Sequence, residues 1–288
     1  MSSNVFLTKW SEISGQRFDP LYHSGEVSGF FKKIKYPLKN LNGVIIQMDS
    51  GVGAGKDDQA DFENGVLHLR PTNIDKYGYL KLDRNIYIPQ NKNYSKVEVG
   101  DVIFNNTNSQ ELVGKTLYID NEIDAYYSNH MTKIKVNSEI EAKYLWVIFN
   151  LYQQYRIFYN ICTNWNNQSG VGLELLKSLK IPIPPKQTQE EIVTTIQKAY
   201  QQKQQKENEA KKLLDSIDEY LLQELGIDLP KIDESDISKR VFLRKWSEIS
   251  GNRFDSVFHR SAFKVLMEII QNNTYAKLKD LVIFSSEI

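Results

Sequence analysis

The sequence has little cysteine, no long hydrophobic run and no excess of charge of either sign. It contains a single cysteine, Cys162, in 288 residues. One cysteine cannot form an internal disulfide, so a small buried thiol is the simplest interpretation. The mean hydropathy is −0.47, and no apolar stretch reaches the roughly 20 residues that a membrane helix needs. The start of the chain shows no basic region followed by an apolar one, which predicts no signal peptide and a cytoplasmic location.

The charges balance, with 36 basic and 36 acidic residues. A balanced chain is not expected to coat nucleic acid non-specifically, because such binding needs many cations that displace counterions from phosphates. A protein that recognises a DNA sequence through a local basic groove stays possible.

Motifs for catalysis or cofactor binding are also missing. The sequence has no dinucleotide fingerprint, no cluster of zinc ligands and no nucleophile elbow, and it has only four histidines. The glycine-rich stretch SGVGAGKDD fails the phosphate-loop pattern, since Ser50 replaces the first glycine and Asp57 replaces the magnesium-binding hydroxyl. A nuclease would need clustered carboxylates, whereas Glu141 is better explained as part of a helix cap. We therefore expect a non-catalytic chain that holds no cofactor and no metal.

A long internal repeat is present. Residues 5–23 and residues 241–259 are identical at 14 of 19 positions, with the sequence KWSEISG in both copies. A period of 236 residues is far longer than the roughly 20–50 residues of a solenoid repeat. The repeat therefore predicts that a second domain begins at residue 240. The second copy is too short to bury a core of its own.

Before the repeat, the pattern predicts a mixed α/β domain. Short β-rich runs, bounded by Gly, Asn, Asp or Pro, occur at residues 43–49, 65–71, 84–90, 99–106, 115–120 and 130–137. A helix with a capping box from Ser138 to Glu141 is expected over residues 138–161, and a shorter one over residues 172–179. Three prolines within residues 182–185 end the domain.

A long helix is predicted next, from a cap at Thr188 to Leu225, with Gly226 as its C-terminal stop. At 1.5 Å per residue it would be about 55 Å long. Its apolar positions have coiled-coil spacing, and an apolar stripe on an isolated helix would be exposed to water. We therefore expect a second helix alongside, although a solvated tether between two domains is an alternative. The expected pairing residues are Ile192, Ile196, Ala199, Ala210, Leu214, Ile217, Leu221 and Leu225.

Taken together, several segments resemble the DNA-specificity subunits of type I restriction-modification systems. The matching segments are VFLTKWSEISGQRFDP, FNNTNSQELVGK, YSNHMTKIKV, ICTNWNNQSGVGLELLKSLKIPIPP, and the long helix that begins with QTQEEIV. The resemblance covers nearly the whole chain and implies two target-recognition domains separated by two antiparallel helices. Only one recognition domain and one helix are present, so the sequence fits either a half-length subunit or a fragment of a longer one. A half-length subunit could pair with a second copy of itself.

The resemblance implies a division of the chain into four parts. These are a mixed α/β target-recognition domain at 1–185, a long coiled-coil-type helix at 186–226, a linker at 227–239 and the partial start of a second repeat at 240–288. It also implies partners: double-stranded DNA, methyltransferase subunits that use S-adenosylmethionine, and a restriction subunit that uses ATP and magnesium. The alternative is a coiled-coil scaffold that binds only protein, and a stand-alone nuclease is a third, weaker possibility.

Candidate DNA-binding residues lie in polar loops next to aromatic residues. Asn and Gln amides can pair with adenine in the major groove, and Lys or Arg beside Tyr suits phosphate contact. The same residue types are also common in ordinary turns and hairpins, so a structural role is an open alternative. The candidates are Arg70, Lys76, Tyr77, Tyr79, Lys81, Asn105, Asn106, Thr107, Asn108, Ser109, Asn129, His130, Asn166, Asn167, Gln168 and Ser169.

Overall fold

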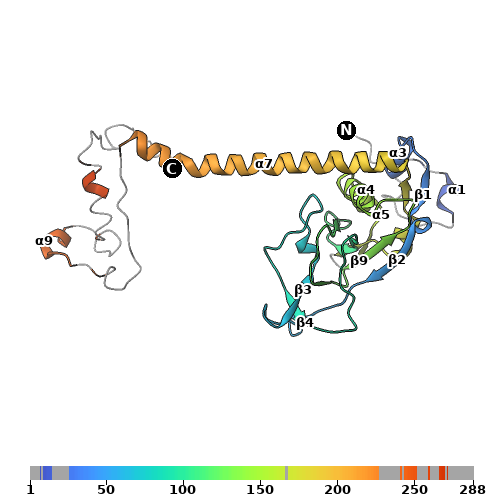
Figure 1. The fold of residues 1–288 in the computed structure, drawn as a ribbon, viewed down its shortest axis with the longest axis horizontal. Coiled ribbons are helices and arrows are strands. Elements are labelled where there is room, and N and C mark those ends of the chain that lie inside the picture. Colours follow the sequence, from blue (N-terminus) through green and yellow to red (C-terminus); the bar gives the residue numbers. More distant parts are fainter. Residues whose placement is uncertain are drawn as a thin grey trace. The chain divides into compact units, whose positions relative to one another are not determined.

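The structure is a computed structural model, and it divides the chain into two compact units, Met1–Tyr200 and Gln201–Ile288 (Figure 1). Among the residues it describes, no helix is both long enough and apolar enough to span a membrane. The described residues are 7, 9–14, 26–165, 168–226, 241, 243–251, 259, 266–269 and 271.

A four-stranded antiparallel sheet lies at the centre of the first unit, with the strand order β2-β9-β5-β7. Its central strand β5 is buried on both faces. Val102 and Phe104 belong to one hydrophobic cluster, and Ile103 between them belongs to another. This alternation follows from the two-residue period of a strand. The strand bounds are β2 (Ile45–Ser50), β5 (Val102–Asn105), β7 (Thr116–Tyr118) and β9 (Met131–Val136).

The described residues also form three smaller sheets. In the sheet β4-β3-β8, β3 pairs antiparallel with β4 and parallel with β8; another sheet has the order β10-β11-β6, and β1 pairs with β12. The six predicted β-runs each contain or overlap a strand, which confirms that part of the pattern. The remaining bounds are β1 (Leu38–Asn40), β3 (Gly65–Leu69), β4 (Tyr87–Pro89), β6 (Thr107–Asn108), β8 (Ala125–Tyr127), β10 (Thr163–Trp165), β11 (Gln168–Gly170) and β12 (Lys180–Pro182).

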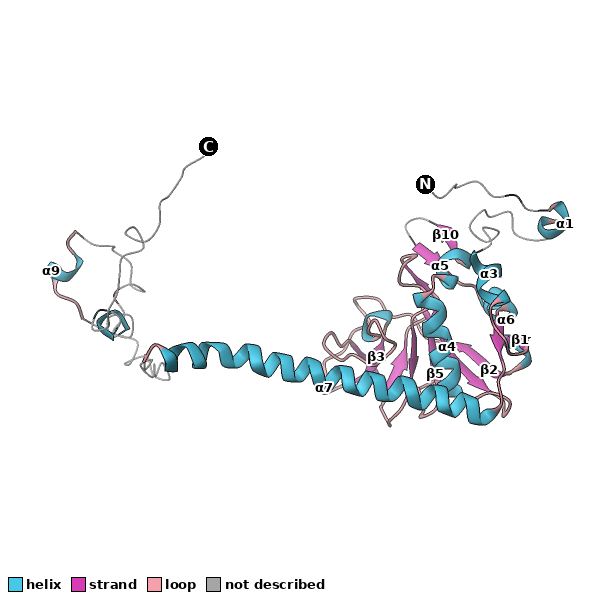
Figure 2. Ribbon diagram, turned by 90° about the horizontal axis from the view of Figure 1, so that it is seen from above, coloured by secondary structure: helices cyan, strands magenta, loops and turns pink. Residues whose placement is uncertain are grey.

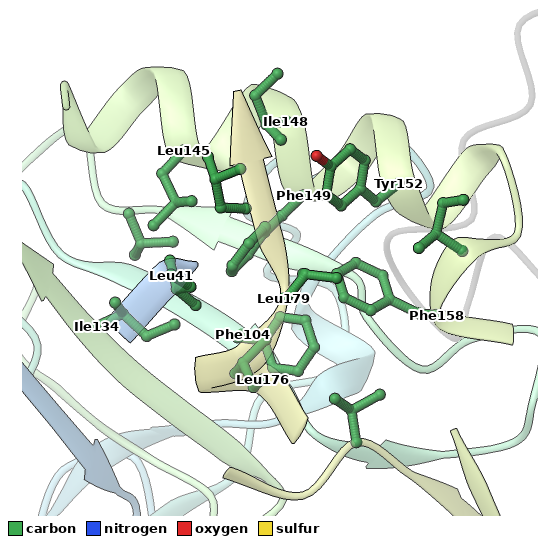
Figure 3. Close-up of a cluster of buried hydrophobic side chains, with 14 of the residues drawn as sticks. Leu41, Phe104, Ile134, Leu145, Ile148, Phe149, Tyr152, Phe158, Leu176 and Leu179 are labelled. Atoms are coloured by element: carbon green, nitrogen blue, oxygen red, sulfur yellow. The ribbon is translucent and has the colours of Figure 1, made fainter. Parts of the chain in front are cut away.

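Helix α4 (Ala142–Gln154) covers one face of the central sheet and contacts β5 and β7 (Figure 2). The largest hydrophobic cluster lies between them (Figure 3). In it, the rings of Phe104, Phe149 and Phe158 meet edge to face, with centroids 5.0–5.7 Å apart. Burying each such side chain contributes about 1.5–3 kcal/mol. The shorter helical segments are α3 (Glu26–Lys32), α5 (Ile157–Ile161), α6 (Leu173–Ser178), η1 (Leu41–Gly43) and η2 (Pro71–Asn73).

The helix predicted over residues 138–161 is interrupted. Arg156 adopts a left-handed backbone with φ of 59°, which separates α4 from α5. The predicted capping box is wrong as well, because Glu141 is the N-cap residue and its side chain makes no capping bond. Its backbone N–H instead donates to the side chain of Gln189, which is distant in the sequence. A partner from another helix has replaced the local cap.

The predicted long helix is confirmed as α7 (Lys186–Glu224), one uninterrupted helix of 39 residues (Figure 1). It begins two residues before Thr188, so the predicted cap at Thr188 is wrong. Gln189 and Val193, in the first part of the helix, are buried. Gly226 follows the helix with φ of +62°, as expected of a C-terminal stop.

The repeated sequence WSEI forms the same short helix in both copies, as α1 (Trp10–Ile13) and α9 (Trp246–Ile249). Trp10 and Trp246 are each 72% exposed. In each copy the N–H of the serine four residues on, Ser14 or Ser250, donates to the tryptophan carbonyl oxygen at 2.8 Å. The rest of the expected second repeat is described only in part, and the expected linker at 227–239 lies outside the described residues. That part of the organisation stays a prediction.

Candidate functional site

A polar cleft forms where β3 and β8 end. Because the two strands are parallel, the residues that follow them meet at the same edge of the sheet. Arg70 follows β3, and Ser128, Asn129 and His130 follow β8. The backbone N–H of Ser128 donates to the carbonyl oxygen of Leu69 at 2.8 Å, which holds the two strand ends together.

The short strand β6 brings a second set of polar residues to the same place. The backbone N–H of Asn106 donates to the carbonyl oxygen of His130 at 2.9 Å. Strand β11 then pairs with β6, so that Ser169 lies opposite Asn108. These four segments, together with Ala54, line one cleft with a volume of about 530 Å³.

Seven predicted DNA-binding residues line this first cleft: Arg70, Thr107, Asn108, Ser109, Asn129, His130 and Gln168. Three other polar residues of the lining, His68, Thr72 and Ser128, are not among the predicted DNA-binding residues. His68 lies within an apolar strand, where alternation predicts only packing. The only available signal was its position two residues before Arg70, at the end of β3.

A second cleft of about 510 Å³ shares Ser109 and Gln168 with the first, so the two adjoin. Its rim carries Trp165, which is 45% exposed. A Cβ atom at Gly170 would lie 2.5 Å from the Trp165 ring, so glycine is needed for this close contact. One edge of the indole thus lies close to Gly170 of β11, and part of the ring remains accessible.

The first cleft has basic and neutral polar groups, and its lining contains no carboxylate. Its cation is Arg70, and His68 and His130 add two imidazoles. Burial holds the pKa of His68 below its usual value of 6.5, and the nearby Arg70 charge lowers it further. Neutral His68 donates from Nε2 to the carbonyl oxygen of Val52 at 3.1 Å. The cleft is therefore suited to an anionic or hydrogen-bonding ligand.

The turn after β8 is rigid at its base and exposed at its tip. The Ser128 hydroxyl is buried, accepts from the His130 N–H at 3.2 Å and donates to Asn129 Oδ1 at 3.3 Å. The Asn129 backbone N–H donates to the carbonyl oxygen of Val52 at 2.9 Å. The side chains of Asn129 and His130 are exposed. A fixed backbone thus presents one amide and one imidazole to the cleft.

Three predicted DNA-binding residues outside the first cleft, Asn105, Asn106 and Ser169, form side-chain hydrogen bonds within the domain. Asn105 is completely buried, and its amide donates to the carbonyl oxygen of Leu112 at 3.0 Å. The Asn106 amide donates to the carbonyl oxygen of Val171, also at 3.0 Å. Ser169 is buried and donates to Asn164 Oδ1. Asn105 and Asn106 line neither cleft, and Ser169 lines the second.

Four other predicted residues, Lys76, Tyr77, Tyr79 and Lys81, lie outside both clefts. Tyr79 stacks on Tyr200 of α7, with ring centroids 3.6 Å apart. Burial raises the pKa of Tyr79 to about 12. Lys81 forms an ion pair with Asp83 at 2.8 Å. Asn166 and Asn167 lie outside the described residues.

The apolar residues predicted for helix pairing lie in two different environments, one packed against the core and one exposed. Ile192 packs against the core of the first unit. The others are exposed, namely Ile196, Ala199, Ala210, Leu214, Ile217, Leu221 and Leu225. Leu213 and Tyr220 are also exposed and widen the apolar surface near the end of α7.

Within the described residues, no group of three His, Cys, Asp or Glu side chains is arranged to hold a metal ion.

Comparison with known families gives a match to the type I restriction modification DNA specificity domain over residues 71–214, half of the chain. The chain belongs to this family. The matched region includes most of the first cleft and the first 29 residues of α7. The specificity-domain match thus agrees with the resemblance that the sequence segments show.

Individual relatives of this specificity-domain chain match over 33% to 73% of its length. A putative type I restriction enzyme MjaX specificity subunit from Methanocaldococcus jannaschii is 31% identical over 96 residues, which is 33% of this chain and 23% of the relative. The S subunit structure from M. genitalium has a TM-score of 0.45 and 14% identity, and covers 73% of this chain and 49% of that one. The HsdS structure from Thermoanaerobacter tengcongensis has a TM-score of 0.43 and 14% identity, with 63% and 45% covered. The chain spans less than a quarter of the curated relative and about half of each solved protein.

Proposed function

We propose that this chain recognises one half of a bipartite double-stranded DNA target and has no catalytic activity of its own. The observation that carries the proposal is the first cleft. It gathers seven of the predicted DNA-binding residues from four separate segments and has no carboxylate in its lining. A cation beside several amides and hydroxyls is the combination that phosphate contact and base recognition require.

The residues of the cleft have different proposed roles. Arg70 contacts a phosphate and positions the domain on the duplex, because its charge attracts every sequence equally. Asn129, Asn108 and Gln168 contact base edges, since an amide presents both a donor and an acceptor. His130 stands next to Asn129 and donates to phosphate or to a base acceptor. Trp165 supports the hairpin β10-β11 at the rim of the second cleft.

The proposed role of α7 is to hold two recognition domains at a fixed separation. The exposed apolar residues near its end need a partner helix, and a second copy of the chain would supply one across a twofold axis. The target would then be symmetric, with half-sites about one helical turn apart. By family resemblance, the same helix docks methyltransferase subunits, which bind S-adenosylmethionine, and the ATP-dependent restriction subunit.

DNA binding is the decisive test. Sites are selected from a random duplex library with the full chain and a methyltransferase subunit, and the affinity for the selected site is measured from 50 to 200 mM salt. We expect a bipartite selected sequence and an affinity that falls steeply with salt. In Arg70→Ala, the salt dependence of log affinity falls by about one unit for the lost phosphate contact, with an unchanged selected sequence.

Lys92→Ala is the matched control, since Lys92 is an exposed cation that lines neither cleft. It removes the same charge and is expected to leave affinity and salt dependence unchanged. The opposite outcome is a wild-type chain that selects no sequence in the presence of the methyltransferase and binds duplex DNA no more tightly at 50 mM than at 200 mM salt. That outcome would favour the alternative function, a coiled-coil scaffold that binds only protein.

A further inference from the structure

The loop from Asp75 to Leu80 is wedged between α4 and the first part of α7. On the α4 side, the Trp146 indole N–H donates to the carbonyl oxygen of Gly78 at 2.9 Å. Gly78 has φ of +85°, and a Cβ atom there would lie 2.2 Å from the Asn150 side chain. The glycine is therefore required for the loop to approach α4 this closely.

On the α7 side, the loop contacts Tyr200 through a carboxylate and two rings. Asp75 Oδ2 accepts a hydrogen bond from the Tyr200 hydroxyl at 3.0 Å. Its other oxygen, Oδ1, accepts the backbone N–H groups of Tyr77 and Tyr79 at 2.8 and 2.9 Å. One carboxylate thus fixes both the shape of the loop and the position of a helix residue.

The rings of Tyr77, Tyr79 and Tyr200, which we call the tyrosine cluster, add a stacked contact. Tyr79 and Tyr200 are nearly parallel, with an interplanar angle of 11°, and Tyr77 meets Tyr200 edge to face at 5.7 Å. Tyr79 also contacts Trp146 of α4 at 5.1 Å. The cluster therefore links α4, the loop and α7 in one packed unit.

A second attachment lies 11 residues earlier in α7, at Gln189. Its side chain is completely buried, accepts from the Glu141 N–H at 2.8 Å, and donates to the carbonyl oxygens of Glu139 and Pro184. At 1.5 Å per residue, the two attachments are about 16 Å apart along the axis. Two contacts at this separation define the direction of a helix, whereas one would leave it free to pivot.

Both attachments lie within the first compact unit, which ends at Tyr200. The helix itself continues without a break to Glu224. The residues that bind the loop and the residues beyond Tyr200 thus belong to one helix.

We propose that Asp75, Tyr79 and Tyr200 are positioning residues for the spacing of the DNA target. This inference rests on the proposed function, in which α7 sets the separation of two recognition domains. The cluster holds α7 at one angle to the recognition domain, so that only one separation and one relative rotation of the half-sites fit. Spacing specificity thus depends on these residues, whereas half-site specificity depends on the first cleft.

The test uses the full chain with its methyltransferase subunit and a series of duplexes that carry the selected half-sites with spacers lengthened or shortened by one to four base pairs. We expect the wild type to lose about tenfold or more in affinity per step away from its best spacer, ~1.4 kcal/mol for each factor of ten. In Tyr200→Ala, the affinities across the series converge to within about threefold, while half-site substitutions keep their full effect. Tyr200→Phe keeps the aromatic ring and loses the hydroxyl that donates to Asp75, so its profile is intermediate.

The control is Thr194→Ala, an exposed residue of the same helix, which keeps the wild-type profile. Thermal unfolding and solution mass are measured for each variant, so that unfolding or dissociation is recognised. A folded Tyr200→Ala variant with the sharp wild-type optimum overturns the positioning role and leaves DNA recognition intact. A wild type that binds none of the duplexes overturns the proposed function together with this inference.

Discussion

Asn106 and Val171 bind each other through two hydrogen bonds across 65 residues of sequence. The Asn106 side chain donates to the carbonyl oxygen of Val171 at 3.0 Å, and the Val171 N–H donates to the carbonyl oxygen of Asn106 at 2.9 Å. This pair joins the segment that carries Asn108 to the hairpin that carries Gln168. Neither residue lines the first cleft, yet the cleft depends on both.

The first prediction separates this supporting residue from a DNA-contacting one. We expect Asn106→Ala to lower the free energy of unfolding by about 1 kcal/mol, because a partly buried hydrogen bond is lost. Asn108→Ala should change stability by less than about 0.5 kcal/mol and reduce discrimination between the selected and a mismatched base by about 1–3 kcal/mol. Urea denaturation and DNA titrations measure the two effects. Equal stability losses in both variants would contradict the assignment.

The second prediction concerns the buried amide at the start of α7. Gln189→Ala removes the partner of the Glu141 N–H and of two carbonyl groups, so we expect a loss of about 1–3 kcal/mol in the free energy of unfolding. Gln187→Ala, two residues earlier and exposed, is the matched control and should be nearly neutral. Denaturant unfolding of both variants measures the difference. A neutral Gln189→Ala would show that α7 does not depend on this anchor.

The third prediction is a pH dependence that arises from His68. Its pKa in the folded protein is below 6.5, chiefly because of burial, whereas in the unfolded chain it returns to the usual value. The unfolded state then binds a proton that the folded state does not, so this contribution to stability is present above pH 6.5 and is lost as pH falls below it.

The measurement compares wild type with His68→Gln, whose amide can still donate to the Val52 carbonyl oxygen. Unfolding free energies between pH 8 and pH 5 should fall more steeply for the wild type. An NMR titration of the His68 ring should give a midpoint below 6.5. A midpoint at or above 6.5 would show that the imidazole is solvated in the folded protein.

The fourth prediction tests pairing through α7. Leu214 is 67% exposed, and a partner helix would cover it. We expect Leu214→Glu to shift the solution mass from dimer to monomer, since a buried carboxylate at a helix pair is costly. Ser216→Glu adds the same charge about 200° around the helix and should leave the dimer intact. Light scattering over a range of concentrations distinguishes them, and a wild type that is monomeric throughout would exclude pairing.

Much of the fold could be predicted from local patterns. Apolar runs bounded by turn residues located strands such as β5 and β9, and helical spacing together with Gly226 located the extent of α7 within about two residues. The short strands β6, β8 and β11 were not predicted, because two or three residues carry too little periodicity. They exist through pairing with strands that are distant in the sequence.

Helix boundaries show the same limit. Ser138 and Glu141 match the sequence pattern of a capping box, but the Glu141 N–H donates to the side chain of Gln189, 48 residues away. Similarly, Tyr77 and Tyr79 have the basic and aromatic neighbours expected of a phosphate contact, and their rings pack with Tyr200 instead. Residue type alone does not show whether an aromatic side chain meets a ligand or another helix.

The sequence by itself determined the family resemblance, the repeat at residue 240, most of the longer elements and the polar character of the loops. Each of these depends on residues that are neighbours along the chain. Only the tertiary structure decided which polar residues share a cleft, which are buried as supports, and how the loop at Asp75 holds α7. The physical reason is that a parallel strand pair and a few long-range hydrogen bonds bring these groups together, and such pairings depend on the packing of the whole domain rather than on any local pattern.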